Sequence, residues 1–314
     1  MVLLFKSAWD DAGEWTRCLQ AEEPELEVRV WPEVGEAADI EFALVWEPPP
    51  GDLKRYPNLK AIFSLAAGVD HILGDPELPE GVPVVRMVDQ SLTAQMSEYA
   101  VYHVLRYHRN MHLYENFQRE RRWEQLPLHR ARDRRVGMLG IGVLGQDAGR
   151  KLQALGFDVV GWRRTARPID GIETFHGAGG LTPFLNRTDI LVCLLPLTPA
   201  TRGILNAGTF AALPKGAFVI NMARGGHLVE EDLIAALGSG QPDSGHLAGA
   251  TLDVFREEPL PPDHPFWRHP KITVTPHIAS LSDARSGAAD IIDNIRRLRA
   301  GKPVRNLVDP EIGY

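Results

Sequence analysis

Residues 140–145 read Gly140-Ile141-Gly142-Val143-Leu144-Gly145 and directly follow the apolar run Arg135-Val136-Gly137-Met138-Leu139. The residues that come next have the apolar spacing of a helix. In such a unit the first glycine permits a tight turn, the second lets a pyrophosphate approach the backbone, and the third lets the helix pack on the strand. Free N–H groups at the helix start attract phosphate. We therefore predict a dinucleotide-binding loop with contacts from Gly140, Gly142, Val143, Leu144 and Gly145.

Alternating strands and helices continue from this loop towards the end of the chain. Short apolar runs, each followed by a polar or helical stretch, predict strands near residues 136–141, 157–162, 190–195, 217–221, 248–253 and 272–275. Six strands with helices between them favour one doubly wound parallel sheet.

A smaller α/β unit precedes the loop, with strand-like runs at residues 2–5, 28–31, 43–46, 59–65 and 82–87. One long helix is expected from Ser91 to about Trp123, and a last helix, over residues 282–300, is expected to return to the first unit. The expected fold class is α/β with two Rossmann-like domains. Residues 98–281 would form the nucleotide domain, and residues 1–97 with 282–314 a smaller flavodoxin-like domain.

Composition narrows the class of partner. The chain has 314 residues, 44% hydrophobic and 24% charged, with a formal net charge of -7. This acidic balance argues against a nucleic-acid-binding protein. We interpret the basic run from Arg119 to Arg135 as a solvated helix face and loop. Only Cys18 and Cys193 are present, so neither a disulfide framework nor a metal site is predicted. No apolar run suits a membrane span or a signal peptide, and we expect a cytoplasmic protein.

The turn after the second strand of the nucleotide domain bears on the choice of cofactor. It reads Gly161-Trp162-Arg163-Arg164-Thr165-Ala166-Arg167. An NAD site usually has a carboxylate here for the ribose 2′-OH, and this turn has none. Guanidinium groups match a phosphate, so Arg163, Arg164 and Thr165 are expected to hold the 2′-phosphate of NADP. An ordinary exposed basic turn is the alternative, and NAD stays possible.

Three further motifs each end a predicted strand, where ligands bind in open parallel sheets. They are Asn221-Met222-Ala223-Arg224-Gly225-Gly226, Leu252-Asp253-Val254-Phe255-Arg256-Glu257-Glu258-Pro259 and Thr273-Val274-Thr275-Pro276-His277. Taken singly, Arg224 suits a surface arginine, Glu258 a solvated loop charge and His277 a capped or core histidine.

Taken in order, the glycine loop and these motifs resemble the D-isomer-specific 2-hydroxyacid dehydrogenases over nearly the whole chain. Other stretches resemble the glyoxylate/hydroxypyruvate reductase A group of that family. They are Leu44-Val45-Trp46, Ala67-Gly68-Val69-Asp70, Gln95-Met96 with Glu98-Tyr99, residues 253–262, and Gly313-Tyr314.

The resemblance implies reduction of a small 2-keto acid, such as glyoxylate or hydroxypyruvate, with NADPH. His277 would donate the proton to the keto oxygen, because an imidazole exchanges protons near neutral pH. Glu258 would bond the other ring nitrogen and stabilise the imidazolium, with Glu257 as the fallback. Arg224 would hold the substrate carboxylate and polarise the keto oxygen.

The resemblance also implies contacts with less distinctive residues. The backbone of Ala67, Gly68 and Val69 would bind the substrate carboxylate, and Trp46 would line its pocket; a plain turn and core packing are the alternatives. Leu195, Pro196 and Thr201 would flank the adenosine and phosphates. Around the nicotinamide we expect Met222, Ala223, Asp253, His277 and Ala279, with the Asp253 carboxylate accepting from the carboxamide.

Some expectations depart from the family pattern or compete with it. Residues 240–245 look like a loop insertion that should lie far from the chemistry. A homodimer is implied, with the helix from Ser91 as a contact and Trp123 reaching the neighbouring subunit's site. The rival functions are an NAD-preferring 2-hydroxyacid dehydrogenase and a non-catalytic, dinucleotide-sensing corepressor.

Overall fold

The computed structural model describes residues 1–240, 244–310 and 312–314. These divide into two compact units. Unit 1 comprises Met1–Leu92 and Leu281–Tyr314, and unit 2 comprises Thr93–Ser280. Unit 2 thus begins at residue 93, where the sequence suggested residue 98, and ends at residue 280.

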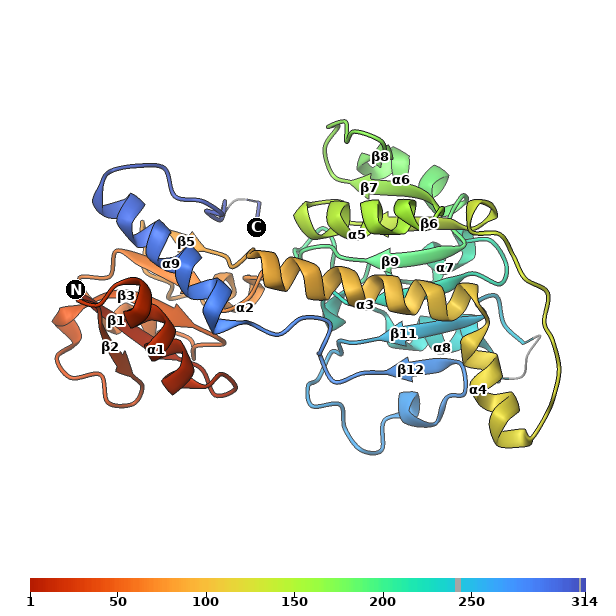
Figure 1. Ribbon diagram of the computed structural model, residues 1–314, viewed down its shortest axis with the longest axis horizontal. Coiled ribbons are helices and arrows are strands. Elements are labelled where there is room, and N and C mark those ends of the chain that lie inside the picture. The colour runs from red at the N-terminus through yellow and green to blue at the C-terminus, as the bar shows by residue number, and fades with distance from the viewer. Residues whose placement is uncertain (241–243, 311) are drawn as a thin grey trace. The chain divides into compact units, whose positions relative to one another are not determined.

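Unit 2 is built on a parallel sheet in the order β12-β11-β10-β9-β6-β7-β8 (Figure 1). Its strands are β6 (Arg135–Leu139), β7 (Asp158–Arg163), β8 (Glu173–His176), β9 (Ile190–Cys193), β10 (Phe218–Asn221), β11 (Gly249–Leu252) and β12 (Ile272–Val274). The order reverses between β6 and β9, as it does in a doubly wound nucleotide-binding sheet. The predicted fold class is confirmed for this unit.

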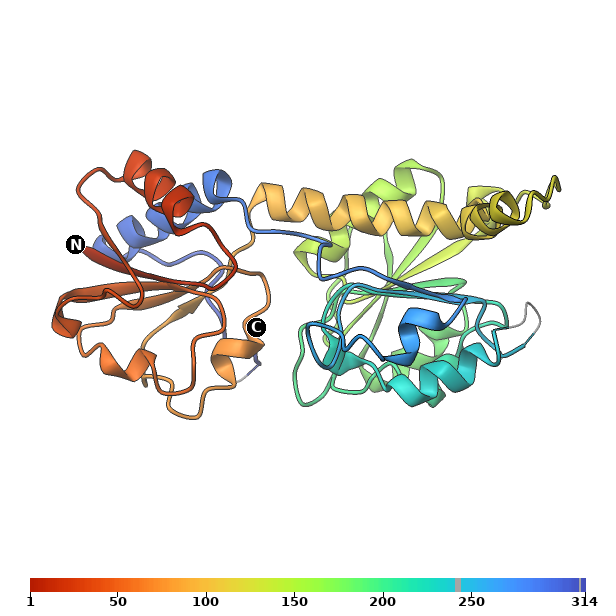
Figure 2. The ribbon, with the colours of Figure 1, turned by 90° about the horizontal axis from the view of Figure 1, so that it is seen from below.

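Helices cover both faces of this sheet. They are α3 (Gln90–His108), which starts in unit 1, α4 (Met111–Glu120), α5 (Val143–Ala154), α6 (Gly177–Leu185), α7 (Ala207–Ala212) and α8 (Glu230–Leu237). Figure 2 shows α3 on one face and α8 on the other. Parallel strands flanked in this way are buried on both sides, so β9 and β10 are apolar along almost their whole length.

Two predictions for unit 2 are wrong. The sheet has a seventh strand, β8, which the sequence did not indicate because its four residues lie at an edge and none is fully buried. The single helix from Ser91 to Trp123 is two helices, α3 and α4. Asn110 separates them in the left-handed conformation, with φ of 56°, which asparagine tolerates better than most residues.

Unit 1 has the strand order β2-β1-β3-β4-β5, all parallel, which is the flavodoxin-like order. Its strands are β1 (Val2–Lys6), β2 (Glu27–Val30), β3 (Ile40–Val45), β4 (Ala61–Ser64) and β5 (Val84–Val85). Its helices are α1 (Ala12–Glu22), α2 (Asp70–Leu73) and α9 (Ala284–Arg299). Helices α1 and α9 lie against one another, so the last helix does belong to the unit formed by the start of the chain.

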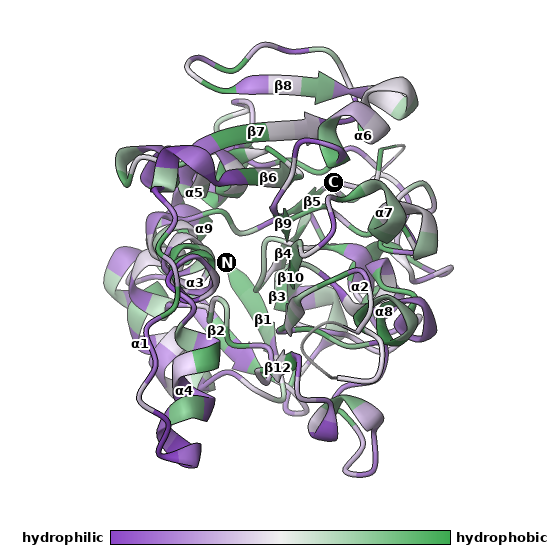
Figure 3. Ribbon diagram, turned by 90° about the vertical axis from the view of Figure 1, so that its right-hand side faces the viewer, coloured by the Kyte–Doolittle hydropathy of each residue, from purple (hydrophilic) through white to green (hydrophobic). Residues whose placement is uncertain are grey.

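The cores of both units lie along their central strands. Every residue of β1 and β10 is buried, and Figure 3 shows β1 in hydrophobic colours. Each fully buried leucine or phenylalanine there stabilises its unit by about 1.5–3 kcal/mol. Within the described ranges, no helix is long and apolar enough to cross a membrane.

The suspected insertion lies partly outside the described residues, which omit 241–243. Its described flanks lie beside the residues that precede β12. The Lys271 ammonium donates to the carbonyl oxygens of Leu237 (3.1 Å) and Ser244 (2.5 Å). These flanks therefore lie at the amino ends of the strands, opposite the edge to which the predicted site residues belong.

Candidate active site

The carboxyl ends of the strands of unit 2 bring the predicted site residues to one edge of the sheet. In register, Asn221 of β10 pairs with Cys193 of β9 and Leu252 of β11, and Leu252 pairs with Val274 of β12. Leu195, Met222 and Asp253 therefore leave the sheet side by side. The glycine loop leaves it at the switch point between β6 and β9, where dinucleotides bind in this topology.

The three glycines of the loop differ in what a side chain would meet. Gly140 has φ of 102°, and a Cβ there would lie 2.7 Å from the Leu194 carbonyl carbon. A Cβ on Gly145 would lie 2.2 Å from the Gly140 oxygen. By contrast, a Cβ on Gly142 would meet nothing within 4 Å. That open space lies before the first residue of α5, Val143, and the loop fits a pyrophosphate.

The turn after β7 presents its basic residues to solvent. Arg164 and Thr165 are exposed, while Arg163 is partly buried. Arg163 Nη1 donates to the carbonyl oxygen of Arg167 at 3.3 Å, and this hydrogen bond closes the turn. The buried Nε of Arg163 lacks a hydrogen-bond partner among the described residues. The exposed guanidinium of Arg164 and hydroxyl of Thr165 are groups that suit an anion.

The loop after β9 is ordered by its own polar groups. The Thr201 hydroxyl donates to the Pro196 carbonyl oxygen (2.7 Å) and accepts from the Thr198 amide (2.9 Å). Leu195 is 8% exposed, so it packs in the core. His227 was not predicted from the sequence to be part of the site. Its Nδ1 lies 3.1 Å from the Arg224 carbonyl oxygen, and its Nε2 lies 3.2 Å from the Pro196 carbonyl oxygen. This buried histidine links the two loops, and no local pattern distinguishes it.

Arg224 is held at the end of β10 by its neighbours. The Asn221 amide donates to the Arg224 carbonyl oxygen at 3.0 Å, and Arg224 Nη1 donates to the Ala223 oxygen at 2.8 Å. A Cβ on Gly225 would lie 1.8 Å from the Phe255 carbonyl carbon. The loops after β10 and β11 therefore meet backbone to backbone, which only glycine permits. Met222 and Ala223 are buried at this junction.

Glu258 and His277 form a hydrogen-bonded pair. Glu258 Oε2 lies 2.7 Å from His277 Nδ1, and each side chain is 34% exposed. Glu257, the fallback, is exposed. The other Glu258 oxygen accepts from the Phe255 amide at 2.8 Å. Burial alone would raise the pKa of the Glu258 carboxyl, but these two bonds and the charge of Arg224 outweigh it and lower that pKa.

Asp253 holds the segment that carries His277, whose backbone is strained. His277 has φ of 53°, a conformation that costs free energy and persists only where the surrounding structure enforces it. The fully buried Asp253 carboxylate accepts from the Ile278 amide (2.9 Å), the Ala279 amide (2.8 Å) and the Thr275 hydroxyl (2.6 Å). A carboxylate has about four acceptor sites, so a carboxamide contact from Asp253 stays a prediction.

Unit 1 places its predicted substrate residues at the carboxyl ends of two neighbouring strands. Trp46 follows β3, and its ring centroid lies 4.4 Å from that of His71. Ala67, Gly68 and Val69 lie between β4 and α2. Ala67 and Gly68 are partly exposed, whereas Val69 is 2% exposed. A carboxylate would therefore meet the backbone of Ala67 and Gly68 more readily than that of Val69.

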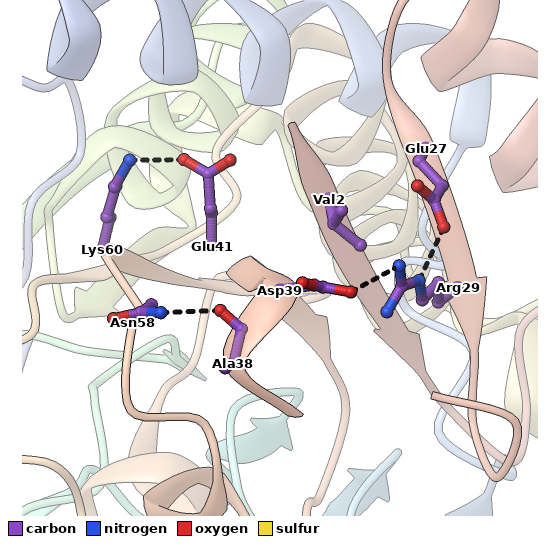
Figure 4. Close-up of a pocket in the computed structure, with 8 residues that line it drawn as sticks. All are labelled: Val2, Glu27, Arg29, Ala38, Asp39, Glu41, Asn58 and Lys60. Carbon is purple, nitrogen blue, oxygen red and sulfur yellow. Dashed lines mark hydrogen bonds and ion pairs between the residues drawn. The ribbon is translucent and has the colours of Figure 1, made fainter. Parts of the chain in front are cut away.

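A depression of about 650 Å³ lies at the opposite, amino-terminal edge of the unit 1 sheet. Its charged side chains bind one another: Arg29 pairs with Glu27 and Asp39, and Lys60 pairs with Glu41 (Figure 4). Each of these charged side chains therefore already has an ion-pair partner. In the described part of the chain, no three His, Cys, Asp or Glu residues are grouped as metal ligands would be.

Known proteins resemble this chain over its full length. A model of the "D-isomer specific 2-hydroxyacid dehydrogenase, NAD binding domain" family matches residues 101–279. The glyoxylate/hydroxypyruvate reductase A of Serratia proteamaculans is 44% identical, over 100% of both chains. The protein of the same name from Yersinia enterocolitica is 42% identical over the same shares.

Solved structures agree with these matches. A D-isomer-specific 2-hydroxyacid dehydrogenase from Xanthobacter autotrophicus, in complex with NADPH and MES, is 45% identical with a TM-score of 0.95, covering 100% of this chain and 99% of that one. An NADPH-dependent glyoxylate/hydroxypyruvate reductase from Sinorhizobium meliloti, in complex with NADP and sulfate, is 42% identical with a TM-score of 0.92 and the same coverage. The chain therefore belongs to the D-isomer-specific 2-hydroxyacid dehydrogenase family and is an NAD(P)-dependent oxidoreductase.

Proposed function

We propose that this protein reduces small 2-keto acids with NADPH, converting glyoxylate to glycolate and hydroxypyruvate to D-glycerate. The observation that carries the proposal is the Glu258–His277 hydrogen bond of 2.7 Å. It lies at the sheet edge that also carries the glycine loop. The relatives from Serratia and Sinorhizobium are named for these two substrates.

The residues of unit 2 suit NADP. Gly142 leaves open space for the pyrophosphate, and Gly140 and Gly145 permit the close backbone contacts of the loop. Arg163 and Arg164 supply cations where an NAD site has a carboxylate. The Xanthobacter and Sinorhizobium structures are NADPH and NADP complexes. When bound, a reduced nicotinamide supplies the hydride that the keto carbon accepts.

His277 is assigned as the proton donor. Its Nδ1 lies 2.7 Å from Glu258 Oε2, and Nε2 is the ring nitrogen that we assign to the keto oxygen. The lowered pKa of Glu258 keeps that carboxyl ionised near neutral pH, and an ionised partner stabilises the imidazolium. Arg224 is assigned to the substrate carboxylate and to the charge that develops on the keto oxygen. One group thus delivers a proton while another holds the substrate.

Unit 2 is assigned as the nucleotide domain and unit 1 as the substrate domain. In unit 1, the backbone of residues 67–69 is assigned to the substrate carboxylate and Trp46 to the pocket wall. Both segments end parallel strands, the usual place for ligands in such sheets.

A cytoplasmic homodimer is the assembly we propose. Trp123 is 98% exposed, Leu128 is 68% exposed and Met111 is 47% exposed, and all three belong to α4 or the segment that follows it. Apolar surface of this kind suits a protein contact. Light scattering should give twice the chain mass, and a monomer at micromolar concentration would contradict the dimer.

The function is tested by following the absorbance of NADPH and NADH with a panel of short 2-keto acids. We expect rapid oxidation of NADPH with glyoxylate and hydroxypyruvate, and slower oxidation of NADH. Faster turnover with NADH would favour the NAD-preferring dehydrogenase. Binding of NADPH without turnover on any keto acid would favour the sensor and contradict the proposal.

A further inference from the structure

Helix α3 presents three polar aromatic side chains to the sheet of unit 2. Tyr99, His103 and Tyr107 are spaced four residues apart, so they share one face of the helix. The Tyr107 hydroxyl lies 2.7 Å from the Thr251 hydroxyl, and His103 Nδ1 lies 3.3 Å from that same oxygen. The Tyr99 hydroxyl lies 2.7 Å from the Thr275 hydroxyl. The helix is therefore bonded to β11 and to the residue that follows β12.

The direction of the bond from Tyr99 follows from counting protons. A threonine hydroxyl has one proton, and that of Thr275 points to Asp253 Oδ1, 2.6 Å away. Thr275 must then accept from Tyr99, so the tyrosine is the donor. Burial and the charge of Asp253 raise the pKa of Tyr99 far above its ordinary value, so the donor keeps its proton at any pH at which the protein would be assayed.

The same carboxylate fixes the segment around His277. It accepts from the amides of Ile278 and Ala279, and the Asp253 carbonyl oxygen accepts from the His277 amide at 2.8 Å. Three bonds from one residue thus hold a histidine whose φ is 53°. An uninterrupted chain of hydrogen bonds therefore runs from Tyr99 through Thr275 and Asp253 to the backbone of the His277 segment.

We propose that Tyr99 is a positioning residue for proton transfer at His277, acting through Thr275 and Asp253. The inference rests on the proposed role of His277 as proton donor. Without the Tyr99 hydroxyl, the Thr275 hydroxyl loses the bond that fixes its rotation. The Thr275–Asp253 bond is then no longer strengthened by the bond from Tyr99, and the carboxylate holds the His277 segment less firmly.

The test removes only the hydroxyl. In Tyr99→Phe, kcat for keto-acid reduction should fall about tenfold, the effect of one hydrogen bond of ordinary strength, while KM and the Kd for NADPH stay within about twofold. Tyr102→Phe is the matched control, because Tyr102 lies on the same helix and is 59% exposed. It should behave as wild type.

A second pair of variants and a second readout separate positioning from packing. Thr275→Val should lower kcat as Tyr99→Phe does, and Thr275→Ser, which keeps the hydroxyl, should restore most of it. Amide hydrogen exchange at Ile278 and Ala279 should be faster in Tyr99→Phe than in wild type, with or without substrate.

The outcomes are distinct. Wild-type kcat and exchange in Tyr99→Phe, beside an inactive His277→Ala, would overturn this inference alone. A lower unfolding midpoint with unchanged kcat would also overturn it, because Tyr99 would then only pack. Full turnover in His277→Ala would overturn the assignment of His277 as proton donor and the role of Tyr99 with it, whereas absence of turnover by the wild type on any keto acid would overturn the proposed function itself.

Discussion

Glu258 Oε2 and His277 Nδ1 lie 2.7 Å apart on loops that leave the neighbouring strands β11 and β12. Parallel pairing brings the ends of these strands together. The Phe255 amide donates a hydrogen bond to the other oxygen of Glu258, which fixes the orientation of that carboxylate. A general acid needs this kind of support, because its charged form must be stabilised while its ring keeps one orientation.

Removing the charge of Glu258 should therefore slow turnover. We expect Glu258→Gln to lower kcat about tenfold to a hundredfold, since charge-assisted hydrogen bonds contribute about 1.5–3 kcal/mol. Steady-state kinetics with glyoxylate measures the effect. Glu257→Gln is the control, because that side chain is exposed and adjacent. An equal loss in the control would make Glu257 the partner after all.

Cofactor choice should depend on the turn after β7. Replacing Arg163 and Arg164 together by serine should raise the KM for NADPH by at least about tenfold and leave that for NADH nearly unchanged, because only NADPH has a 2′-phosphate for the cations to bind. Arg150→Ser removes a charge from an exposed position on α5 and is the control. Equal losses for the two cofactors would remove the phosphate-binding role.

Alanine substitution should affect cofactor binding at the second glycine of the loop and stability at the third. A Cβ on Gly142 meets no protein atom within 4 Å, so Gly142→Ala should weaken NADPH binding while the unfolding midpoint stays near that of wild type. A Cβ on Gly145 would lie 2.2 Å from a backbone oxygen, so Gly145→Ala should lower the midpoint itself. Calorimetry on the two variants distinguishes these results; unaltered NADPH affinity in Gly142→Ala would refute the pyrophosphate site.

Stability should fall at mildly acidic pH because of His103. Burial, with the nearby charge of Arg106, lowers the pKa of His103 from 6.5 to about 4. The unfolded chain therefore binds more protons between these values, and the free energy of unfolding decreases as pH falls from 6.5 towards 4, by about 3 kcal/mol in all. Urea unfolding should show a shallower pH dependence for His103→Asn. The exposed control His129→Asn should keep the wild-type slope.

The parts of the fold that repeat a local pattern were predictable. Glycine spacing placed the loop at the switch point, and apolar runs located every strand of the two sheets except β8. Edge strand β8 has no buried residue to mark it. The break at Asn110 rests on one backbone torsion inside a sequence with continuous helical periodicity.

The candidate site likewise contains residues that the sequence predicted and residues that it did not. The resemblance of the motifs after three strands to those of a known family pointed to Arg224, Glu258 and His277, each of which suited an ordinary surface or core residue when taken singly. Tyr99 and His227 were not assigned a role, since each acts through contacts between segments far apart in the chain: the oxygen that Tyr99 bonds lies 176 residues away. Such pairs leave no periodic trace in the sequence.

The central claim is that His277 donates the proton in NADPH-dependent keto-acid reduction. The most direct measurement compares wild type with His277→Ala in the NADPH absorbance assay, with NADPH affinity measured in parallel by fluorescence. We predict that kcat falls by about 100-fold or more, the usual contribution of a general acid, while the Kd for NADPH is unchanged. Turnover by His277→Ala at the wild-type rate would contradict the account.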